Sequence, residues 1–183
     1  MLGTTACPVD VIFVLDESSS VKEDNFELIK SFLSQVVGML DVDSGNTRVG
    51  LVPFSTQVDT AEAFNLNAYS SLASVQSAIS SLIYSQGLTH TAAALRYVRT
   101  DMLTSAAGDR PDVPNVVVVL TDGPANVKED EIEVCTRTGN VFRKNYRFLA
   151  FKKLQYLKSP GFSVFTFYAI LFRSYLISHY FIF

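Results

Sequence analysis

The sequence predicts an α/β fold built on a doubly wound, mostly parallel sheet flanked by helices. Short and almost continuously apolar runs at residues 9–15, 47–55 and 115–120 are typical of strands buried on both faces. Segments with the 3.6-residue apolar period of helices separate these runs. Strands that alternate with helices need crossover connections, and crossover connections place parallel strands in one sheet.

The first strand, residues 9–15, is rich in β-branched residues and ends at Asp16. A helix is expected to begin near Asp24, because Asp24 and Glu27 have the spacing of a capping box. The apolar residues that follow form a single helical stripe: Phe26, Ile29, Leu33, Val36 and Leu40.

The stretch 41–46 reads as a turn, residues 47–55 as the second strand and residues 58–64 as a weaker third strand. Pro53 lies within the second strand and has no N–H to donate to a neighbouring strand. That end of the strand is therefore expected near a sheet edge or a bulge.

The spacing of Leu72, Val75, Ile79 and Leu82 predicts a second amphipathic helix. After a loop at 87–91, residues 92–103 are expected to form a third helix. Thr91 would be its N-cap, with three residues facing inward: Leu95, Val98 and Met102. The run 115–120 is the clearest strand of the sequence, and it leads into Thr121, Asp122 and Gly123.

The composition changes beyond about residue 126, so residues 7–140 are assigned to the domain core and residues 141–183 to an aromatic-rich C-terminal segment. The run 162–183 has the length of a membrane span, but Arg173 lies inside it, where a charge is costly. A buried strand at 162–169 is an alternative, as is a tail that is not native domain sequence. We do not expect the membrane to be a partner.

The net charge is −3, and the fifteen Lys and Arg residues are scattered. Nucleic acid is therefore not an expected partner, because phosphate binding needs a concentrated basic face. The two cysteines, Cys7 and Cys135, are too few for a disulfide framework or a four-ligand zinc site, and their spacing does not decide whether they pair. No signal peptide is visible at the N-terminus, which indicates either a cytosolic protein or a piece of a longer one.

Three separated segments place small oxygen-bearing side chains at predicted strand ends: residues 16–20, 87–91 and 120–123. Because the carboxyl ends of parallel strands line one crevice, we expect Asp16 and Asp122 at the same edge of the sheet. The loop that carries Thr89 precedes a helix and can lean over them.

Carboxylates and hydroxyls make a hard oxygen site that suits Mg²⁺, with Mn²⁺ or Ca²⁺ as substitutes, and does not suit zinc or copper. The spacing of Asp16, Ser18 and Ser20 lets one turn aim alternate side chains at one point, whereas Glu17 points away and is left out. So few charged ligands would leave the cation an excess of positive charge and an open position. A carboxylate of a partner could fill that position.

The run Val-Asp-Val-Ile-Phe-Val-Leu-Asp-Glu-Ser-Ser-Ser-Val resembles the opening strand and Asp-x-Ser-x-Ser motif of von Willebrand factor type A domains and integrin inserted domains. Gly-Leu-Thr-His-Thr resembles their threonine loop, and Val-Val-Val-Leu-Thr-Asp-Gly their later aspartate strand. The resemblance spans residues 7 to about 130. It implies a Rossmann-like fold and a metal-ion-dependent adhesion site.

In that site Ser18, Ser20 and Thr89 would ligate the metal directly, and Asp16 and Asp122 would act directly or through water. Family members mostly mediate protein–protein adhesion, many of them in extracellular matrix proteins such as matrilins and collagen VI. Cys7 precedes the first strand as in those members, where such a cysteine often pairs near the domain end.

The resemblance thus implies a cation-dependent binding module, not an enzyme. Its partner would be an extracellular matrix or cell-surface protein that offers an acidic side chain, and its location would be extracellular. One alternative is a cytoplasmic scaffold module of the same fold. A magnesium-dependent hydrolase is another, but Ser18 stands where an aspartyl phosphatase would need a second acid, and no Gly-x-Ser-x-Gly elbow is present.

The C-terminal part departs from the family pattern. Residues 142–158 could stand for the expected helix and residues 161–169 for the next strand, but no glycine closes that strand.

Overall fold

The computed structural model describes residues 7–122, 146–152, 155–159, 162–166 and 169–171 of the chain. Its main sheet has five strands in the order β2-β1-β3-β4-β7, and the pairs β1–β2, β1–β3 and β3–β4 are parallel. β7 runs antiparallel to β4, and β5 and β6 form a separate antiparallel pair. The strands are β1 (Val9–Asp16), β2 (Thr47–Phe54), β3 (Asn115–Thr121), β4 (Tyr146–Lys152), β5 (Gln155–Ser159), β6 (Phe162–Thr166) and β7 (Ala169–Leu171).

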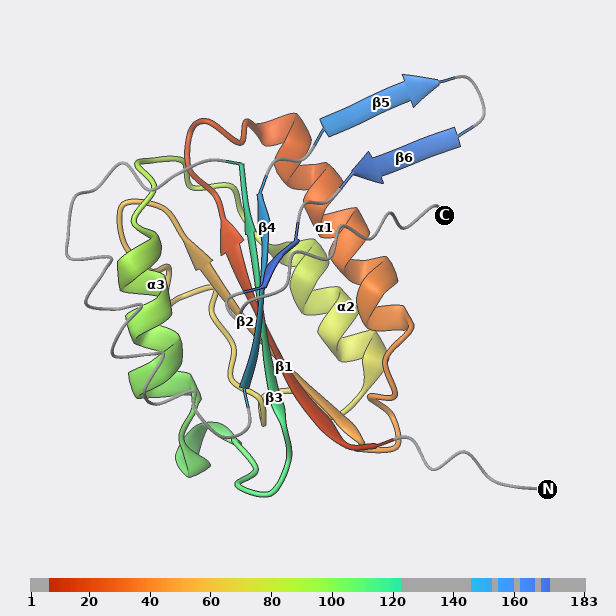
Figure 1. The fold of residues 1–183 in the computed structure, drawn as a ribbon, viewed down its shortest axis with the longest axis vertical. Coiled ribbons are helices and arrows are strands. Elements are labelled where there is room, and N and C mark those ends of the chain that lie inside the picture. Colours follow the sequence, from red (N-terminus) through yellow and green to blue (C-terminus); the bar gives the residue numbers. More distant parts are fainter. Residues whose placement is uncertain (1–6, 123–145, 153–154, 160–161, 167–168, 172–183) are drawn as a thin grey trace.

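Helices cover both faces of the sheet, as predicted for a doubly wound fold (Figure 1). Helices α1 (Glu23–Gly38) and α2 (Leu72–Ser81) lie on one side, and α3 (Thr91–Tyr97) lies on the other. A π-helical turn, η1 (Val98–Met102), continues α3, and a 3₁₀ turn, η2 (Ser105–Ala107), follows it.

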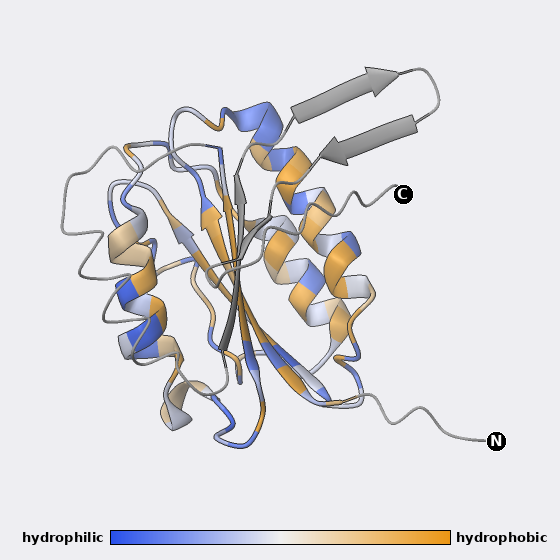
Figure 2. Cartoon of the chain, viewed as in Figure 1, coloured by the Kyte–Doolittle hydropathy of each residue, from blue (hydrophilic) through white to orange (hydrophobic). Residues whose placement is uncertain are grey.

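The alternation of side chains along β1 divides the core into two layers. Phe13 and Leu15 pack in one apolar cluster with residues of α1 and α2 such as Leu33. Ile12 and Val14 pack in the other, together with Val98, Met102 and other residues of α3 and η1. The apolar sides of the helices accordingly face the sheet (Figure 2). Burying each such side chain stabilises the fold by about 1.5–3 kcal/mol.

The predicted strands at 9–15, 47–55 and 115–120 are confirmed, and β2, which contains Pro53, lies at an edge of the sheet. The expected strand at 58–64 is wrong, because only two isolated bridges form there, Leu51–Phe64 and Phe54–Val58. Asp59 Oδ1 accepts bonds from the backbone N–H groups of Ala61 and Glu62. This local turn competes with strand pairing for those N–H groups.

The expected capping box is also wrong. Helix α1 begins at Glu23, and its N-cap Lys22 has a left-handed φ of 67° and gives no side-chain cap, so Asp24 lies within the first turn. Similarly, Thr91 is the first residue of α3, and His90 is its N-cap. The third helix changes to π geometry at Val98, whose carbonyl accepts from the N–H of Leu103.

Two expectations for the C-terminal segment are wrong. Residues 146–152 and 155–159 are strands, not a helix, and the run 162–169 is divided between β6 and β7 in different sheets. Aromatic residues, of which β4 has several, favour strands. β4 pairs in parallel with β3, along the edge of β3 that faces away from β1.

Within the described residues, none of the helices combines the length and apolarity that a membrane crossing requires. Cys7 is exposed, just before β1. Cys135 and the domain boundary at 140 lie outside the described residues.

A candidate metal site at the carboxyl edge of the sheet

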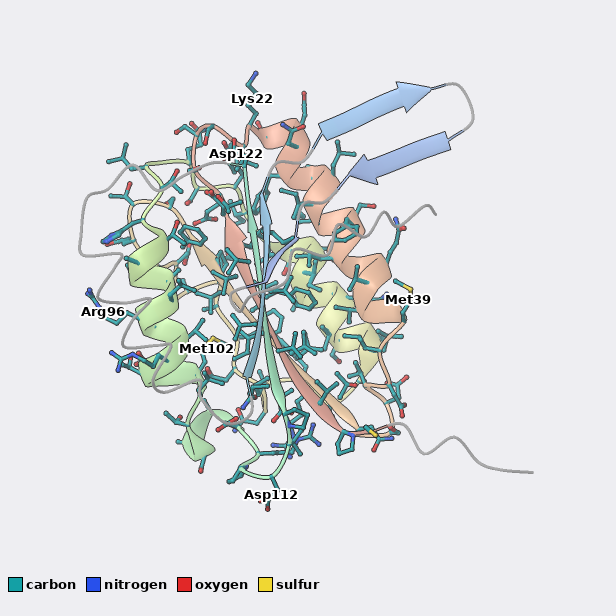
Figure 3. All side chains as sticks on the ribbon, viewed as in Figure 1. Lys22, Met39, Arg96, Met102, Asp112 and Asp122 are labelled. Atoms are coloured by element: carbon teal, nitrogen blue, oxygen red, sulfur yellow. The ribbon has the colours of Figure 1, made fainter. Side chains whose placement is uncertain are left out.

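The loops after β1 and β3 meet at the point where the strand order changes direction. The chain passes from β1 to β2 on one side, and then returns to place β3 on the other side of β1. In open α/β sheets, such a switch point is where the strand ends leave a crevice for a ligand. Asp16 ends β1 and Asp122 follows β3 directly. Figure 3 shows Asp122 at this edge and Asp112 at the opposite end of the molecule.

Asp16 is fully buried, and both of its carboxylate oxygens accept hydrogen bonds. The backbone N–H of Ser18 donates to Oδ1 at 2.8 Å, and the Thr121 hydroxyl donates to Oδ2 at 2.6 Å. Burial raises the pKa of Asp16, and the nearby Asp122 charge raises it further, whereas the Ser18 and Thr121 hydrogen bonds oppose the rise. A nearby cation would favour the ionised form of this carboxyl group.

A chain of hydroxyls links the serine loop to the second aspartate. The Ser18 and Ser20 hydroxyl oxygens lie 3.0 Å apart, and Ser20 donates to Asp122 Oδ1 at 3.0 Å. Direct hydrogen bonds therefore bring together Asp16, Ser18, Ser20 and Asp122, four of the five predicted site residues.

Thr89, the fifth, is brought to the same edge by the backbone of its loop. The N–H of Ser19 donates to the carbonyl of Gly87 at 3.0 Å, and the Ser19 hydroxyl accepts from the Gly87 N–H at 3.1 Å. Gly87 has φ +129°, and a Cβ there would lie 2.7 Å from the Thr56 hydroxyl. Only glycine therefore suits this close approach. Thr89 itself is buried, at 3% exposure.

The charges of the site fit a cation. Two carboxylates converge on this edge, and in the described part of the chain neither forms an ion pair. Among these same residues, no three His, Cys, Asp or Glu side chains gather in a way that could hold a metal. A cation would therefore depend on hydroxyl oxygens, and such an all-oxygen donor set suits Mg²⁺, Mn²⁺ or Ca²⁺.

Sequence reasoning missed two residues next to the site, Thr121 and Tyr84. Thr121 could have been found, because it stands at the end of the aspartate strand, whereas Tyr84 belongs to no recognisable motif. Glu17 was left out of the site because alternation points it away. Glu17 does point away from the site, where the Ser85 hydroxyl donates to its Oε1 at 2.7 Å, and burial raises its pKa. Desolvation raises the pKa of Tyr84, and the charges of Asp122 and Asp16 add to that rise.

Residues 10–153 match the family model of the von Willebrand factor type A domain. The chain is 41% identical to human matrilin-4 over 129 residues, which is 69% of this chain and 20% of that protein. It is 37% identical to the mouse collagen alpha-4(VI) chain over 139 residues, covering 75% of this chain and 6% of that protein. The chain thus spans a small part of the length of these relatives.

Solved structures of similar fold include proximal thread matrix protein 1 from the mussel byssus, with a TM-score of 0.72 and 24% identity. That match covers 80% of this chain and 38% of the other. Another structure of the same mussel protein, which has a zinc-occupied metal-ion-dependent adhesion site, gives a TM-score of 0.69 at 23% identity. It covers 81% of this chain and 39% of that one. The doubly wound sheet and the extent of the family match lead to one assignment: the chain belongs to the von Willebrand factor type A domain family.

Proposed function

We propose that this domain binds one divalent cation, Mg²⁺ in preference, and uses it to bind an acidic side chain of an extracellular matrix or cell-surface protein. The observation that carries the proposal is the hydroxyl chain Ser18–Ser20–Asp122 beside the buried Asp16. Ser20 and Asp122 are 102 residues apart in the chain, and their hydrogen bond supports a shared site of the oxygen atoms that Mg²⁺ prefers.

Ser18, Ser20 and Thr89 would supply neutral ligands, and Asp16 and Asp122 would bind directly or through water. Two carboxylates at most balance the charge of a divalent ion, and hydroxyls donate electron density weakly. A position left open would therefore attract a carboxylate from outside. Binding of this kind needs no turnover, so we propose no enzymatic activity.

Two findings support the location and the general chemistry. The relatives of the chain include a matrilin and a collagen VI chain, which are matrix proteins. A protein of the same fold holds zinc at its metal-ion-dependent adhesion site. For this chain, the oxygen-only donor set favours Mg²⁺, with Mn²⁺ or Ca²⁺ as substitutes.

The test is calorimetric titration of the full chain with MgCl₂ and MnCl₂. We expect one site in the wild type, lost in Asp122→Ala. Asp112→Ala is the matched control, because Asp112 is exposed and lies at the opposite end of the sheet (Figure 3). A folded wild-type chain that binds neither ion would contradict the proposal.

A second arm tests the partner. A peptide with one glutamate, and the same peptide with glutamine in its place, are immobilised, and the chain is added with Mg²⁺ or with EDTA. We expect binding to the glutamate peptide that requires Mg²⁺ and is lost in Asp122→Ala. Binding that is equal in EDTA would show that recognition does not pass through a cation.

A further inference from the structure

The Tyr84 hydroxyl joins the serine loop to the segment that leads into the threonine loop. It donates to the carbonyl of Ser18 at 2.9 Å and accepts from the N–H of Lys22 at 3.0 Å. One hydroxyl therefore fixes both ends of the turn that carries Ser20. The ring of Tyr84 packs against Phe26 of α1, with 5.3 Å between the ring centroids.

A second link joins Ser85 to the buried Glu17, which precedes the same turn. The Ser85 hydroxyl donates to Glu17 Oε1 at 2.7 Å, and the N–H of Glu17 donates to the carbonyl of Phe54. Glu17 is only 1% exposed, and no partner for its Oε2 is found within the described residues. An ionisable side chain is costly to bury, and the hydrogen bond from Ser85 offsets part of that cost while it ties residue 85 to residue 17.

Gly87 follows these two links in the sequence and bonds to Ser19 through its carbonyl and its N–H. Tyr84, Ser85 and Gly87 are therefore each hydrogen-bonded to the segment 17–22. Thr89 follows two residues later. Its position relative to Ser18 and Ser20 consequently depends on this set of hydrogen bonds and not on the sheet alone.

We propose that Tyr84, together with the Ser85–Glu17 pair, is a positioning group that makes the site select Mg²⁺ and Mn²⁺ over Ca²⁺. The inference rests on the proposed function. Mg²⁺ demands near-octahedral geometry with short metal–oxygen distances, whereas Ca²⁺ accepts longer and more variable ones. Loops held rigidly at a fixed separation favour the smaller ion, and loosening them penalises it more.

The experiment compares Tyr84→Phe with Tyr69→Phe in the full chain. Both changes remove one hydroxyl and keep the ring, and Tyr69 packs its ring edge-on against Phe64, away from these loops. Dissociation constants for Mg²⁺, Mn²⁺ and Ca²⁺ are measured by calorimetry, and circular dichroism and urea unfolding in EDTA report on the fold. Ser85→Ala and Ser85→Thr form a second pair, because threonine restores the hydroxyl.

We expect Tyr84→Phe to weaken Mg²⁺ and Mn²⁺ binding by about tenfold, the usual size for a residue that orients ligands. Ca²⁺ binding should change less, so the ratio of the Mg²⁺ to the Ca²⁺ dissociation constant rises. Ser85→Ala should act in the same direction, and Ser85→Thr should stay near the wild type.

Equal weakening for all three ions, or a ratio that matches Tyr69→Phe, would overturn the positioning role while leaving the cation site intact. A wild-type chain that binds no ion would instead refute the proposed function itself. If Tyr84→Phe lowers stability, the Ser85 pair decides the matter, because Ser85 is exposed and urea unfolding in EDTA reports separately on the fold of each variant.

Discussion

The hydroxyl of Ser20 donates to Asp122 at 3.0 Å, although 102 residues separate them in the chain. The contact requires β3 to be inserted beside β1, since Asp122 directly follows β3 and Ser20 lies in the turn that follows β1. The site therefore exists only when the central sheet has formed, and an occupant of the site should stabilise the sheet.

The first prediction concerns that coupling. A cation that binds the folded but not the unfolded chain, present at a hundred times its dissociation constant, should raise the free energy of unfolding by about 2.7 kcal/mol. Thermal unfolding with and without MnCl₂ measures the shift. Asp112→Ala should keep it and Asp122→Ala should lose it. A shift of the same size in Asp122→Ala would assign the bound ion to another place.

The second prediction concerns the opposite end of β1. Asp10 is fully buried, and the Arg110 guanidinium donates to its Oδ1 through Nη2 at 2.6 Å and through Nε at 2.9 Å. Arg110→Ala would leave a buried carboxylate without its countercharge, and we expect a loss of about 3–5 kcal/mol in urea unfolding.

The control for this change is Glu27→Ala. It breaks the ion pair with Lys30, in which Glu27 is 60% exposed. Exposed pairs contribute at most about 1 kcal/mol. Similar losses in the free energy of unfolding for the two variants would mean that the buried pair stabilises the fold no more than the exposed one.

The third prediction compares alanine substitutions at two glycines that have a positive φ. Gly45 has φ +77° and open space around it, whereas Gly108 has φ +93° and a Cβ there would lie 2.7 Å from the backbone nitrogen of Asn67. Gly45→Ala should cost only the strain, about 1–2 kcal/mol. Gly108→Ala should cost at least about 1 kcal/mol more, because the neighbouring backbone must move. Equal losses in chemical denaturation would disprove the close approach.

The fourth prediction concerns pH. Hydrogen bonds from Asn46 and Ser44 lower the pKa of Asp41 below its ordinary 3.8. A carboxyl group with a lowered pKa stabilises the fold above the ordinary value, and that contribution is lost as the pH falls through the lowered one. Asn46→Ala should therefore raise the pKa of Asp41, and it should destabilise the chain more at pH 7 than in strong acid.

NMR titration of the Asp41 carboxyl carbon and urea unfolding along a pH series measure both effects. Asn65→Ala, at an exposed asparagine, is the control and should leave the Asp41 titration unchanged. An unmoved Asp41 pKa in Asn46→Ala would show that the 2.7 Å bond between the two side chains does not govern it.

The central strands were predictable because burial on both faces leaves an apolar run that is visible without any partner. The weak strand expected at 58–64 and the starts of helices were less predictable, because side-chain and backbone hydrogen bonds compete there for the same backbone N–H groups. The bond between Asp59 and the Glu62 N–H prevents a strand, and Lys22 precedes α1 without any capping side chain. Such outcomes follow from tertiary geometry that a spacing rule does not contain.

Some residues of the candidate site could be predicted from the sequence, and others could not. Asp16 and Asp122 could be predicted to share an edge, because each lies at the end of an apolar strand. Glu17 was set aside by its alternation, and Tyr84 stands in a stretch with no motif. Their contacts arise only where one loop folds across another, and nothing in the local sequence marks them.

Cys7 is exposed just before β1, and Asp16 is the last residue of that strand. The thiol and the candidate cation site therefore lie at opposite ends of β1. Eight strand residues at about 3.3 Å each separate them by roughly 25 Å. A surface, dye or neighbouring module attached at Cys7 would therefore leave the candidate cation site, at the other end of β1, accessible to a binding partner.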